Sequence, residues 1–469
     1  MDKKSSMIII ILIALFGIGV GYLYFTKNNK NNTNTSNNTS ATTTTETVID
    51  YGETGIDWSS YETKEITLTE SITITSGGVY NITGTLTDGS ITVNTTDNVK
   101  LILNGVNITC SDGPAINIVS AENTYIELAA GTENTVTDGS TRSDDTLDSA
   151  IYSKDDLILT GSGKLTVNAN YQDGIVSKDE LYIESGTIII NAKDDAINGK
   201  DSVVIYNGTF TINASGDGIK ATNDEDTEKG YIVIENGTFN ITSVKDAIQA
   251  ETKLVIKDGT FNIKTTGNTS SDTAKGLKAG TLIEIDGATF NIDTTDDGIH
   301  SNGNLIVNNG NITIESDDDA IHADGLVEIN NGTFNLTAHE GLEGTYVKIN
   351  DGTININATD DGINAGNKSN DYEVTIEING GNITINMGQG DTDGIDSNGN
   401  LYINGGTINI TGNSPFDYDG KAEYNGGTLI VNGEKTSTIT NQFMGGGMQG
   451  GQPRGEPSPN DKNQGRRMQ

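Results

Sequence analysis

Residues 304–325 read NLIVNNGNITIESDDDAIHADG, and three short segments in this stretch alternate apolar and polar side chains. The segments are centred on Ile306, Thr313 and Ile321. Alternation over a few residues is typical of β-strands. Strands this short are stable only when other strands pack against them. The stretch therefore predicts three strands that form part of a larger repeated structure.

An acidic residue followed by Gly-Ile or Ala-Ile, or by a close variant of that pair, recurs through the second half of the chain. Most copies are 21 or 22 residues apart, and the other intervals run from 29 to 32 residues. The residues at the acidic position are Asp173, Asp195, Asp217, Asp246, Lys275, Asp297, Asp319, Glu340, Asp361 and Asp393. Such a period is typical of repeat proteins, in which each repeat is one structural unit and extra residues form loops.

Three strands and three bends in one period close a coil, and coils stacked in register form parallel sheets about 4.8 Å apart. We therefore predict an all-β fold: a right-handed parallel β-helix, a solenoid of about 22 residues and three short strands per coil. Glycine after Asn or Asp is expected to supply positive φ at one bend. These bends are Asn207-Gly208, Asn236-Gly237, Asp258-Gly259, Asp286-Gly287, Asn309-Gly310, Asn331-Gly332 and Asp351-Gly352, and a second set of bends uses Gly303, Gly325, Gly366 and Gly399.

Equivalent residues of successive coils should form columns along the stack. Phe210, Phe239, Phe261, Phe290 and Phe334 form one such column, which we interpret as core stacking rather than a platform for sugars. A column of small residues runs through Ser177, Gly199, Ala221, Ala250, Ala279, Ser301, Ala323, Gly344, Ala365 and Ser397. Two other repeat folds fit worse: the nonapeptide calcium roll needs a glycine-rich motif every nine residues, and a propeller needs blades of about 40 residues.

The composition excludes several classes of protein. The chain of 469 residues has 65 acidic and 28 basic residues and a net charge of −37, so nucleic acid is an unsuitable partner. Aromatic residues make up only 6% and glycines number 58, which favours small repeated layers over one large globular core. The single cysteine, Cys110, permits no internal disulfide or zinc cluster and is expected to be a small buried residue.

The two ends of the chain differ from the repeats. Residues 7–25 carry no charge and are flanked by lysines, so we predict a transmembrane signal anchor over residues 1–27 that leaves the rest of the chain outside the cell. Residues 28–54, rich in Asn, Thr and Ser, are expected to be a flexible linker. The β-helix is then expected over residues 55–435, and a disordered tail rich in Gly, Met, Gln and Pro over residues 436–469.

The acids of the repeat should lie in adjacent columns. Unpaired carboxylates at the coil spacing repel each other by about 1 kcal/mol per pair in water. Calcium accepts six to eight oxygen ligands in flexible geometry and would neutralise them. The acids concerned are Asp296, Asp297, Asp318, Asp319, Glu340, Asp360 and Asp361. The alternative is that each acid only caps its own bend and stays solvated.

The position just after each Ile faces outward and varies in chemistry along the stack. His300 and His322 occupy it on adjacent coils, where we expect a solvated imidazole pair rather than a metal or ligand site. Lys275 interrupts the acids and is expected to relieve their repulsion. Insertions after Ala221 and Ala365 leave the helix at one corner, where their loops can form the wall of a cleft.

The motifs at 296–303, 318–325, 339–344, 360–365, 393–399 and 416–420 occur in fixed order from about Thr85 to Gly433. Together they resemble the bacterial and archaeal carbohydrate-binding domain-containing proteins built as pectate-lyase-like right-handed β-helices. The resemblance implies a cell-surface protein that binds cellulose and acidic plant polysaccharides such as polygalacturonate, with calcium (Ca²⁺) held along the helix. Within these motifs, the resemblance implies a calcium-binding role for Glu343 as well as for the acids named above.

We weigh three functions. The first is non-catalytic binding of plant cell-wall polysaccharide, in which calcium links two polyanions. The second is a calcium-dependent polysaccharide (pectate) lyase acting by β-elimination, with Lys220, Lys275 or Lys278 as the base; neighbouring acids raise the pKa of a lysine and oppose that role. The third is a calcium-stiffened surface adhesin. We therefore predict no catalytic residue.

Neutral sugars usually stack on exposed aromatic rings, which are scarce in this chain. The candidates outside the core are Trp58, Tyr182, Tyr402, Tyr372 and Tyr418. The surface that would bind cellulose is therefore not assigned by the sequence.

Overall fold

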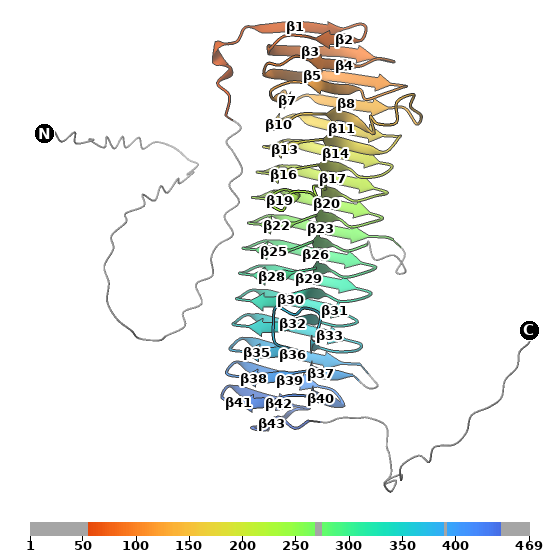
Figure 1. Ribbon diagram of the computed structural model, residues 1–469. Coiled ribbons are helices and arrows are strands. Elements are labelled where there is room, and N and C mark those ends of the chain that lie inside the picture. Colours follow the sequence, from red (N-terminus) through yellow and green to blue (C-terminus); the bar gives the residue numbers. More distant parts are fainter. Residues whose placement is uncertain (1–54, 268–273, 389–391, 442–469) are drawn as a thin grey trace, which may run out of the picture. The chain divides into compact units, whose positions relative to one another are not determined.

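The computed structural model describes residues 55–267, 274–388 and 392–441. The predicted anchor, the predicted linker and residues 442–469 of the predicted tail lie outside the described residues. No helix in the described ranges is both long enough and apolar enough to cross a membrane. The described residues belong to one compact unit and form a parallel β-helix, which confirms the predicted fold class (Figure 1).

Each coil contributes strands to three parallel sheets. Sheet 1 follows the acidic bends and contains β2 (Ile72–Ile74), β4 (Ile91–Asn94), β6 (Ile116–Ser120), β9 (Ser149–Ser153), β12 (Asp173–Ser177), β15 (Ile197–Gly199), β18 (Ile219–Ala221), β21 (Ile248–Ala250), β24 (Leu277–Ala279), β27 (Ile299–Ser301), the first residues of β30 (Ile321–Ile329) and of β32 (Leu342–Ile349), β34 (Ile363–Ala365), β37 (Asp393–Ser397) and β40 (Ser414–Tyr418).

Sheet 2 follows sheet 1 along each coil. It contains β1 (Thr63–Leu68), β3 (Gly78–Leu86), β5 (Val99–Cys110), β7 (Thr124–Leu128), β10 (Leu157–Gly161), β13 (Glu180–Ile183), β16 (Ser202–Ile205), β19 (Tyr231–Ile234), β22 (Lys253–Ile256), β25 (Leu282–Ile285), β28 (Asn304–Val307), the last residues of β30 and β32, β35 (Thr375–Ile378), β38 (Asn400–Ile403) and β41 (Ala422–Tyr424).

Sheet 3 completes each coil. After the last residues of β5 it contains β8 (Glu133–Asp138), β11 (Lys164–Ala169), β14 (Thr187–Ala192), β17 (Thr209–Ala214), β20 (Thr238–Ser243), β23 (Thr260–Thr265), β26 (Thr289–Thr294), β29 (Asn311–Ser316), β31 (Thr333–Ala338), β33 (Thr353–Ala358), β36 (Asn382–Met387), β39 (Thr407–Thr411) and β42 (Thr428–Val431).

The register confirms the predicted column of small residues, because Ala221 pairs with Ala250 and Ala250 with Ala279. Small side chains at this position let the chain turn from sheet 1 into sheet 2 without a collision between coils. Cys110 is buried, as predicted.

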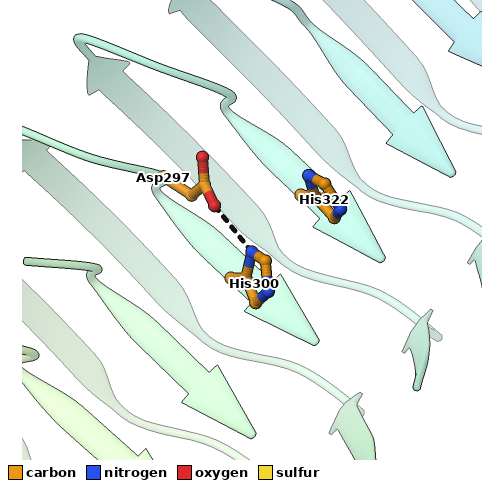
Figure 2. Close-up of side chains that lie close together, drawn as sticks. All are labelled: Asp297, His300 and His322. Atoms are coloured by element: carbon orange, nitrogen blue, oxygen red, sulfur yellow. Dashed lines mark hydrogen bonds and ion pairs between the residues drawn. The ribbon is translucent and has the colours of Figure 1, made fainter. Parts of the chain in front are cut away.

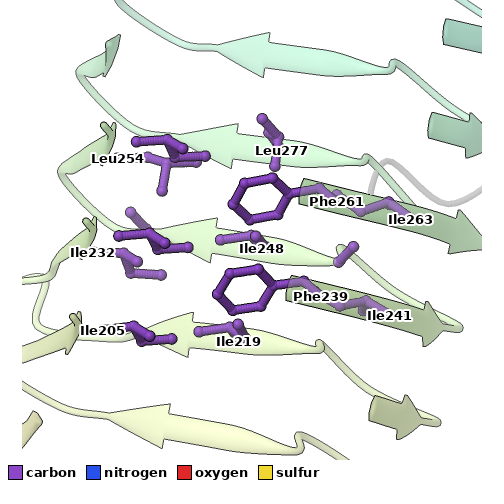
Figure 3. Packing of buried hydrophobic residues seen from close by; sticks show 14 of the residues in the cluster. Ile205, Ile219, Ile232, Phe239, Ile241, Ile248, Leu254, Phe261, Ile263 and Leu277 are labelled. Atoms are coloured by element: carbon purple, nitrogen blue, oxygen red, sulfur yellow. The ribbon is translucent and has the colours of Figure 1, made fainter. Parts of the chain in front are cut away.

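The aromatic column lies in the core, as predicted, with its rings fully buried. Successive rings from Phe210 to Phe290 are 4.6–4.7 Å apart and nearly parallel. Figure 3 shows Phe239 and Phe261 packed between isoleucines and leucines of sheets 1 and 2. Phe334 was expected in the same stack, but Ile312 lies between Phe290 and Phe334, so the continuous aromatic stack ends at Phe290, two coils before Phe334.

The two sets of glycine bends have different causes. Most glycines after Asn or Asp have positive φ, for example Gly208 at 151° and Gly352 at 119°; Gly287 is the exception among the seven named bends. In the second set, close packing requires glycine at Gly303, where a Cβ would lie 2.0 Å from the carbonyl oxygen of Thr281 on the preceding coil.

Short elements precede the first coil and follow the last one. A 3₁₀-helix, η1 (Trp58–Ser60), precedes β1, and Trp58 packs edge-on against Tyr125, with ring centroids 5.3 Å apart. At the other end β43 (Glu434–Thr436) pairs antiparallel with β42, and Asn441 donates a hydrogen bond to the carbonyl oxygen of Tyr418. The last coil is thereby closed by a hairpin.

Candidate functional site

The acidic residue at the start of each sheet 1 strand has a structural role that links neighbouring coils. The carboxylate of Asp195, for example, accepts a hydrogen bond from the backbone N–H of Asp217 on the next coil at 2.7 Å. Equivalent bonds join the pairs Asp173 and Asp195, Asp217 and Asp246, Asp246 and Lys275, Asp297 and Asp319, and Asp361 and Asp393. These acids therefore do not cap their own bends, as the alternative interpretation expected, but bind the backbone of the following coil.

Lysines neutralise part of the column. Lys220 Nζ lies 2.6 Å from Asp217 and 3.5 Å from Asp195. Lys275 Nζ lies 2.7 Å from Asp296 and 3.2 Å from Asp297, and its side chain is almost fully buried. The predicted role of Lys275 as a relief of acidic repulsion agrees with these distances.

Beyond Lys275 the acids and all three histidines of the chain converge on one open cleft of about 530 Å³. We call it the acid–histidine cleft. Its lining residues are Lys275, Lys278, Asp296, Asp297, His300, Asn302, Asp318, Asp319, His322, His339, Glu340, Glu343 and Lys368. Most project from the bends before β24, β27, β30 and β32 or from those strands.

The two stacked histidines form the floor of the cleft. His300 and His322 lie on adjacent coils with ring centroids 4.6 Å apart. His300 Nδ1 lies 2.6 Å from Asp297 Oδ2, as Figure 2 shows. His322 Nδ1 lies 2.9 Å from Asp319 and 2.8 Å from Glu343, and only 8% of the residue is exposed. The prediction of a solvated imidazole pair is therefore wrong, because carboxylates from two coils enclose His322.

Burial and neighbouring charges shift the pKa values of several cleft residues. Burial opposes the charged form of His322, but its bonds to Asp319 and Glu343 raise its pKa to about 10. Burial also opposes ionisation of Glu343, but His322 and Lys368 lower the pKa of Glu343 to about 2. Burial and the charge of Glu343 raise the pKa of Glu340 to about 8. The cleft thus contains a fixed ion pair beside a carboxyl group that resists ionisation.

Burial likewise raises the pKa of Asp319 to about 7. Burial works in the same direction on Asp297, but the contacts with His300 and Lys275 outweigh it and lower the pKa to about 2. A carboxyl group that holds its proton near neutral pH, such as that of Asp319 or Glu340, releases it when a cation binds nearby.

The structure brings together most of the acids predicted to hold calcium. Ligand atoms lie within 4.8 Å of one another in the groups Asp296–Asp297–Asp318, Asp318–Asp319–His339, Asp319–His322–Glu343 and His339–Glu340–Asp360. Asp361 is in none of these groups, since its carboxylate accepts the N–H of Asp393. The sequence reasoning did not name His339 as a possible ligand. Its position directly before Glu340 in the sequence could have suggested it.

The donor chemistry fits calcium best at the rim of the cleft. Calcium takes oxygen ligands, whereas Asp297 and Asp319 already bind imidazoles and Lys275 lies against Asp296. Asp318 is exposed and Asp360 half-buried, and His339 lies 4.0 Å from Asp360. Asp318, Glu340 and Asp360 are therefore the acids best placed to bind such an ion.

The insertion after Ala365 contributes to the cleft, as the sequence suggested for loops at this corner. Lys368 Nζ lies 2.7 Å from Glu343, and Thr345 Oγ1 accepts hydrogen bonds from the backbone N–H groups of Lys368 and Ser369. The insertion after Ala221 does not reach the cleft; its Lys229 pairs with Asp201.

Two of the three lysines considered as catalytic bases are held in their protonated form. Burial opposes the charge on Lys220 and Lys275, but the acids around them outweigh burial and raise the pKa of each ammonium. A base must be neutral before it can accept a proton. The surroundings of these two lysines therefore oppose lyase chemistry.

The aromatic residues considered for sugar stacking are mostly engaged. Tyr182 was expected on the surface but is only 5% exposed and binds Glu180 through its hydroxyl. Trp58 packs against Tyr61 and Tyr125. Lys421 Nζ lies over the ring of Tyr402, 5.8 Å from its centroid.

Known proteins resemble this chain in sequence. The sequence model of the carbohydrate-binding domain-containing proteins matches residues 69–320 and 317–442. A carbohydrate-binding domain-containing protein of Acetivibrio thermocellus is 40% identical over 128 residues, which cover 26% of this chain and 45% of that relative. The chain thus spans less than half the length of that relative. A solved structure, of the polysaccharide lyase-like protein from C. thermocellum in a gadolinium derivative, is 32% identical over 51% of this chain and 87% of that chain, with a TM-score of 0.42.

Proposed function

The chain belongs to the family of carbohydrate-binding domain-containing proteins, and from that premise we propose that the acid–histidine cleft binds acidic plant cell-wall polysaccharide through calcium. The protein would act without catalysis, at the cell surface, tethered by residues 1–27. The observation that carries the proposal is the convergence of carboxylates on one open cleft in a chain of net charge −37.

A cation is needed because the carboxylates of the cleft and those of the polysaccharide repel each other. A polygalacturonate chain carries one carboxylate per sugar, and two carboxylates at about 4 Å repel by about 1 kcal/mol in water and by several times more near a protein surface. Calcium has room for ligands from both partners, since it accepts six to eight oxygens. Asp318, Glu340 and Asp360 would hold the ion on the protein side.

The test uses the full-length protein and immobilised polygalacturonate, with calcium or with a chelator. The double variant Asp318→Asn/Asp360→Asn is expected to bind about tenfold more weakly in calcium, which corresponds to about 1.4 kcal/mol. The control is Asp258→Asn/Asp351→Asn, because Asn already occupies this bend at Asn207 and Asn236. Binding that persists unchanged in chelator would contradict the bridging role of calcium.

A lyase remains the second candidate because Lys275 and Lys278 line the same cleft as the acids. The same samples decide it: β-elimination yields unsaturated uronides, which absorb in the ultraviolet. We expect no increase in absorbance, and an increase abolished by Lys275→Met would establish catalysis.

A further inference from the structure

The outer surface of sheet 3 has a composition unlike the rest of the molecule. Strands β17, β20, β23, β26, β29, β31, β33, β36 and β39 each direct their first and third residues outward, and the register aligns these residues in two columns. The first column is Thr209, Thr238, Thr260, Thr289, Asn311, Thr333, Thr353, Asn382 and Thr407. The second is Thr211, Asn240, Asn262, Asn291, Thr313, Asn335, Asn355, Thr384 and Asn409.

Every position in both columns is therefore Thr or Asn, and we call this surface the Thr/Asn face. All residues of the first column are exposed, and those of the second are exposed or half-buried. The face carries no ionisable side chain, although the chain has 65 acidic residues. Charged residues border the face on both sides, at Lys264, Asp293 and Glu315 in the neighbouring outward column and at Asp258 and Asp351 in the bend before the first column.

Sheet stability alone does not account for asparagine in the middle of these strands. Thr suits an exposed strand, but Asn is depleted in strands relative to β-branched and aromatic residues. On this face two pairs of asparagines are held by hydrogen bonds: Asn262 Nδ2 donates to Asn240 Oδ1 at 3.1 Å, and Asn355 Nδ2 to Asn335 Oδ1 at 3.1 Å. Each donating amide keeps a second N–H directed away from its neighbour. The column therefore presents an oriented amide donor at Asn262 and another at Asn355.

The face is also grooved. Thr211, Asn240, Asn262 and Asn291 line one side of a shallow groove of about 330 Å³. Asn213, Thr242 and the ion pair of Lys264 with Asp293 line the other side, so the groove as a whole has no net charge. The lining residues come from successive coils, so the groove runs along the stacking axis, across the strands. A linear occupant would meet equivalent side chains at every coil, about 4.8 Å apart.

We propose that the Thr/Asn face binds a neutral, extended glycan chain that lies along the stacking axis. The inference rests on the proposed carbohydrate-binding function and assigns a second surface to it. Sugar hydroxyls both donate and accept hydrogen bonds, as do Thr hydroxyls and Asn amides. A face without charge imposes no repulsion on an uncharged chain and gives no attraction to a charged one. One sugar of an extended glycan has a length comparable to one coil, so neighbouring sugars meet neighbouring coils.

The test uses the full-length protein, with insoluble cellulose and polygalacturonate as probes. The variant Thr238→Val/Thr260→Val/Thr289→Val removes three hydroxyls with little change in shape, and Val is at least as favourable in strands. A second variant, Asn240→Asp/Asn262→Asp/Asn291→Asp, removes three donors and adds charge. The control, Asn207→Asp/Asn236→Asp/Asn331→Asp, adds the same charge at the bend where Asp258 and Asp351 occur naturally.

Both face variants are expected to bind cellulose at least about tenfold more weakly than the native protein or the control. Native binding to cellulose is expected to persist in chelator and in 1 M salt, where calcium-dependent binding of polygalacturonate fails. Failure of the native protein to bind cellulose, or equal binding by all variants, would overturn the inference and leave the cleft proposal intact. Loss of cellulose binding in chelator would place the neutral chain in the cleft and overturn it as well. Melting temperatures confirm that each variant is folded.

Discussion

At the scale of single residues, the position of His322 shows how strongly the cleft depends on one side chain. Its imidazole lies between Asp319 and Glu343, which come from its own coil and the next. The period of the repeat predicted that these acids lie near each other. It could not predict that they enclose the ring, because burial of His322 depends on Glu343 and on Lys368, which belong to later parts of the chain.

We expect His322→Ala to lower the free energy of unfolding by about 3 kcal/mol, because removal of one partner leaves buried carboxylates uncompensated. The measurement is the shift of the urea unfolding midpoint in the presence of chelator. His339→Ala is the matched control, since half of its side chain is exposed, and it should change stability by less than about 0.5 kcal/mol. Equal effects of the two substitutions would contradict the bridging role.

Asp173, which lies outside the cleft, is expected to make the free energy of unfolding depend on pH. Burial and the nearby Asp195 raise its pKa from 3.8 to about 8. The folded state therefore keeps a proton that the unfolded state releases, so this stabilisation is full below about pH 4 and is lost as the pH rises to about 8.

Asp173→Asn keeps the oxygen that accepts the N–H of Asp195 and removes the ionisation. Relative to the native protein, the variant should gain up to about 1.4 kcal/mol per pH unit between pH 5 and 8, and no more above that range. Urea unfolding of both proteins at several pH values measures the difference. A difference that does not vary with pH would show that the carboxyl group is ionised in the folded state.

At the scale of elements, the bends from sheet 1 to sheet 2 decide how closely coils stack. The sequence identified these bends through Gly303, Gly325, Gly366 and Gly399. It did not show at which of them a side chain larger than glycine would collide with its surroundings. The structure does: a Cβ at Gly303 would collide with a backbone oxygen at 2.0 Å, whereas at Gly366 the nearest atoms are 3.8 Å away. An insertion follows Gly366. The repeat pattern located this insertion but did not show that it leaves room for a Cβ at the bend.

Gly303→Ala is therefore expected to destabilise the protein by about 2–4 kcal/mol, since rigid backbone has to move. Gly366→Ala should be neutral or slightly stabilising, because alanine restricts the unfolded chain. Thermal unfolding of the two single variants gives the comparison. A loss at Gly366 similar to that at Gly303 would show that conformation, not space, is the requirement there.

At the scale of the whole molecule, the predicted fold class was recovered almost completely because every coil repeats one pattern. Parallel sheets stacked in this way expose unpaired backbone groups at the last coil. Here β43 pairs with β42 in the reverse direction and covers the edge of sheet 3. The sequence indicated only that the β-helix ends near residue 435, since a hairpin of a few residues has no period to detect.

Truncation after Val431 is expected to expose the edge of β42 and to cause end-to-end association of molecules. Light scattering should then show particles that grow with protein concentration, while the full chain remains a single species. The variant Lys435→Pro tests the same edge without removal of the tail, because proline lacks the N–H that a strand pair uses. Monomeric behaviour of both variants would contradict a protective role of the hairpin.

The bonds from each acid to the backbone of the following coil have a consequence for how such a chain changes over generations. The same hydrogen bond joins Asp173 to Asp195, Asp195 to Asp217 and Asp217 to Asp246. Each of these coils therefore makes this same contact with the coil before it and with the coil after it. Duplication or loss of one 22-residue segment within this stretch recreates an identical contact at the point of exchange. The molecule can therefore change length by copy number without new interfaces, and the early coils can act as an adjustable spacer that sets how far the cleft lies from the first coil.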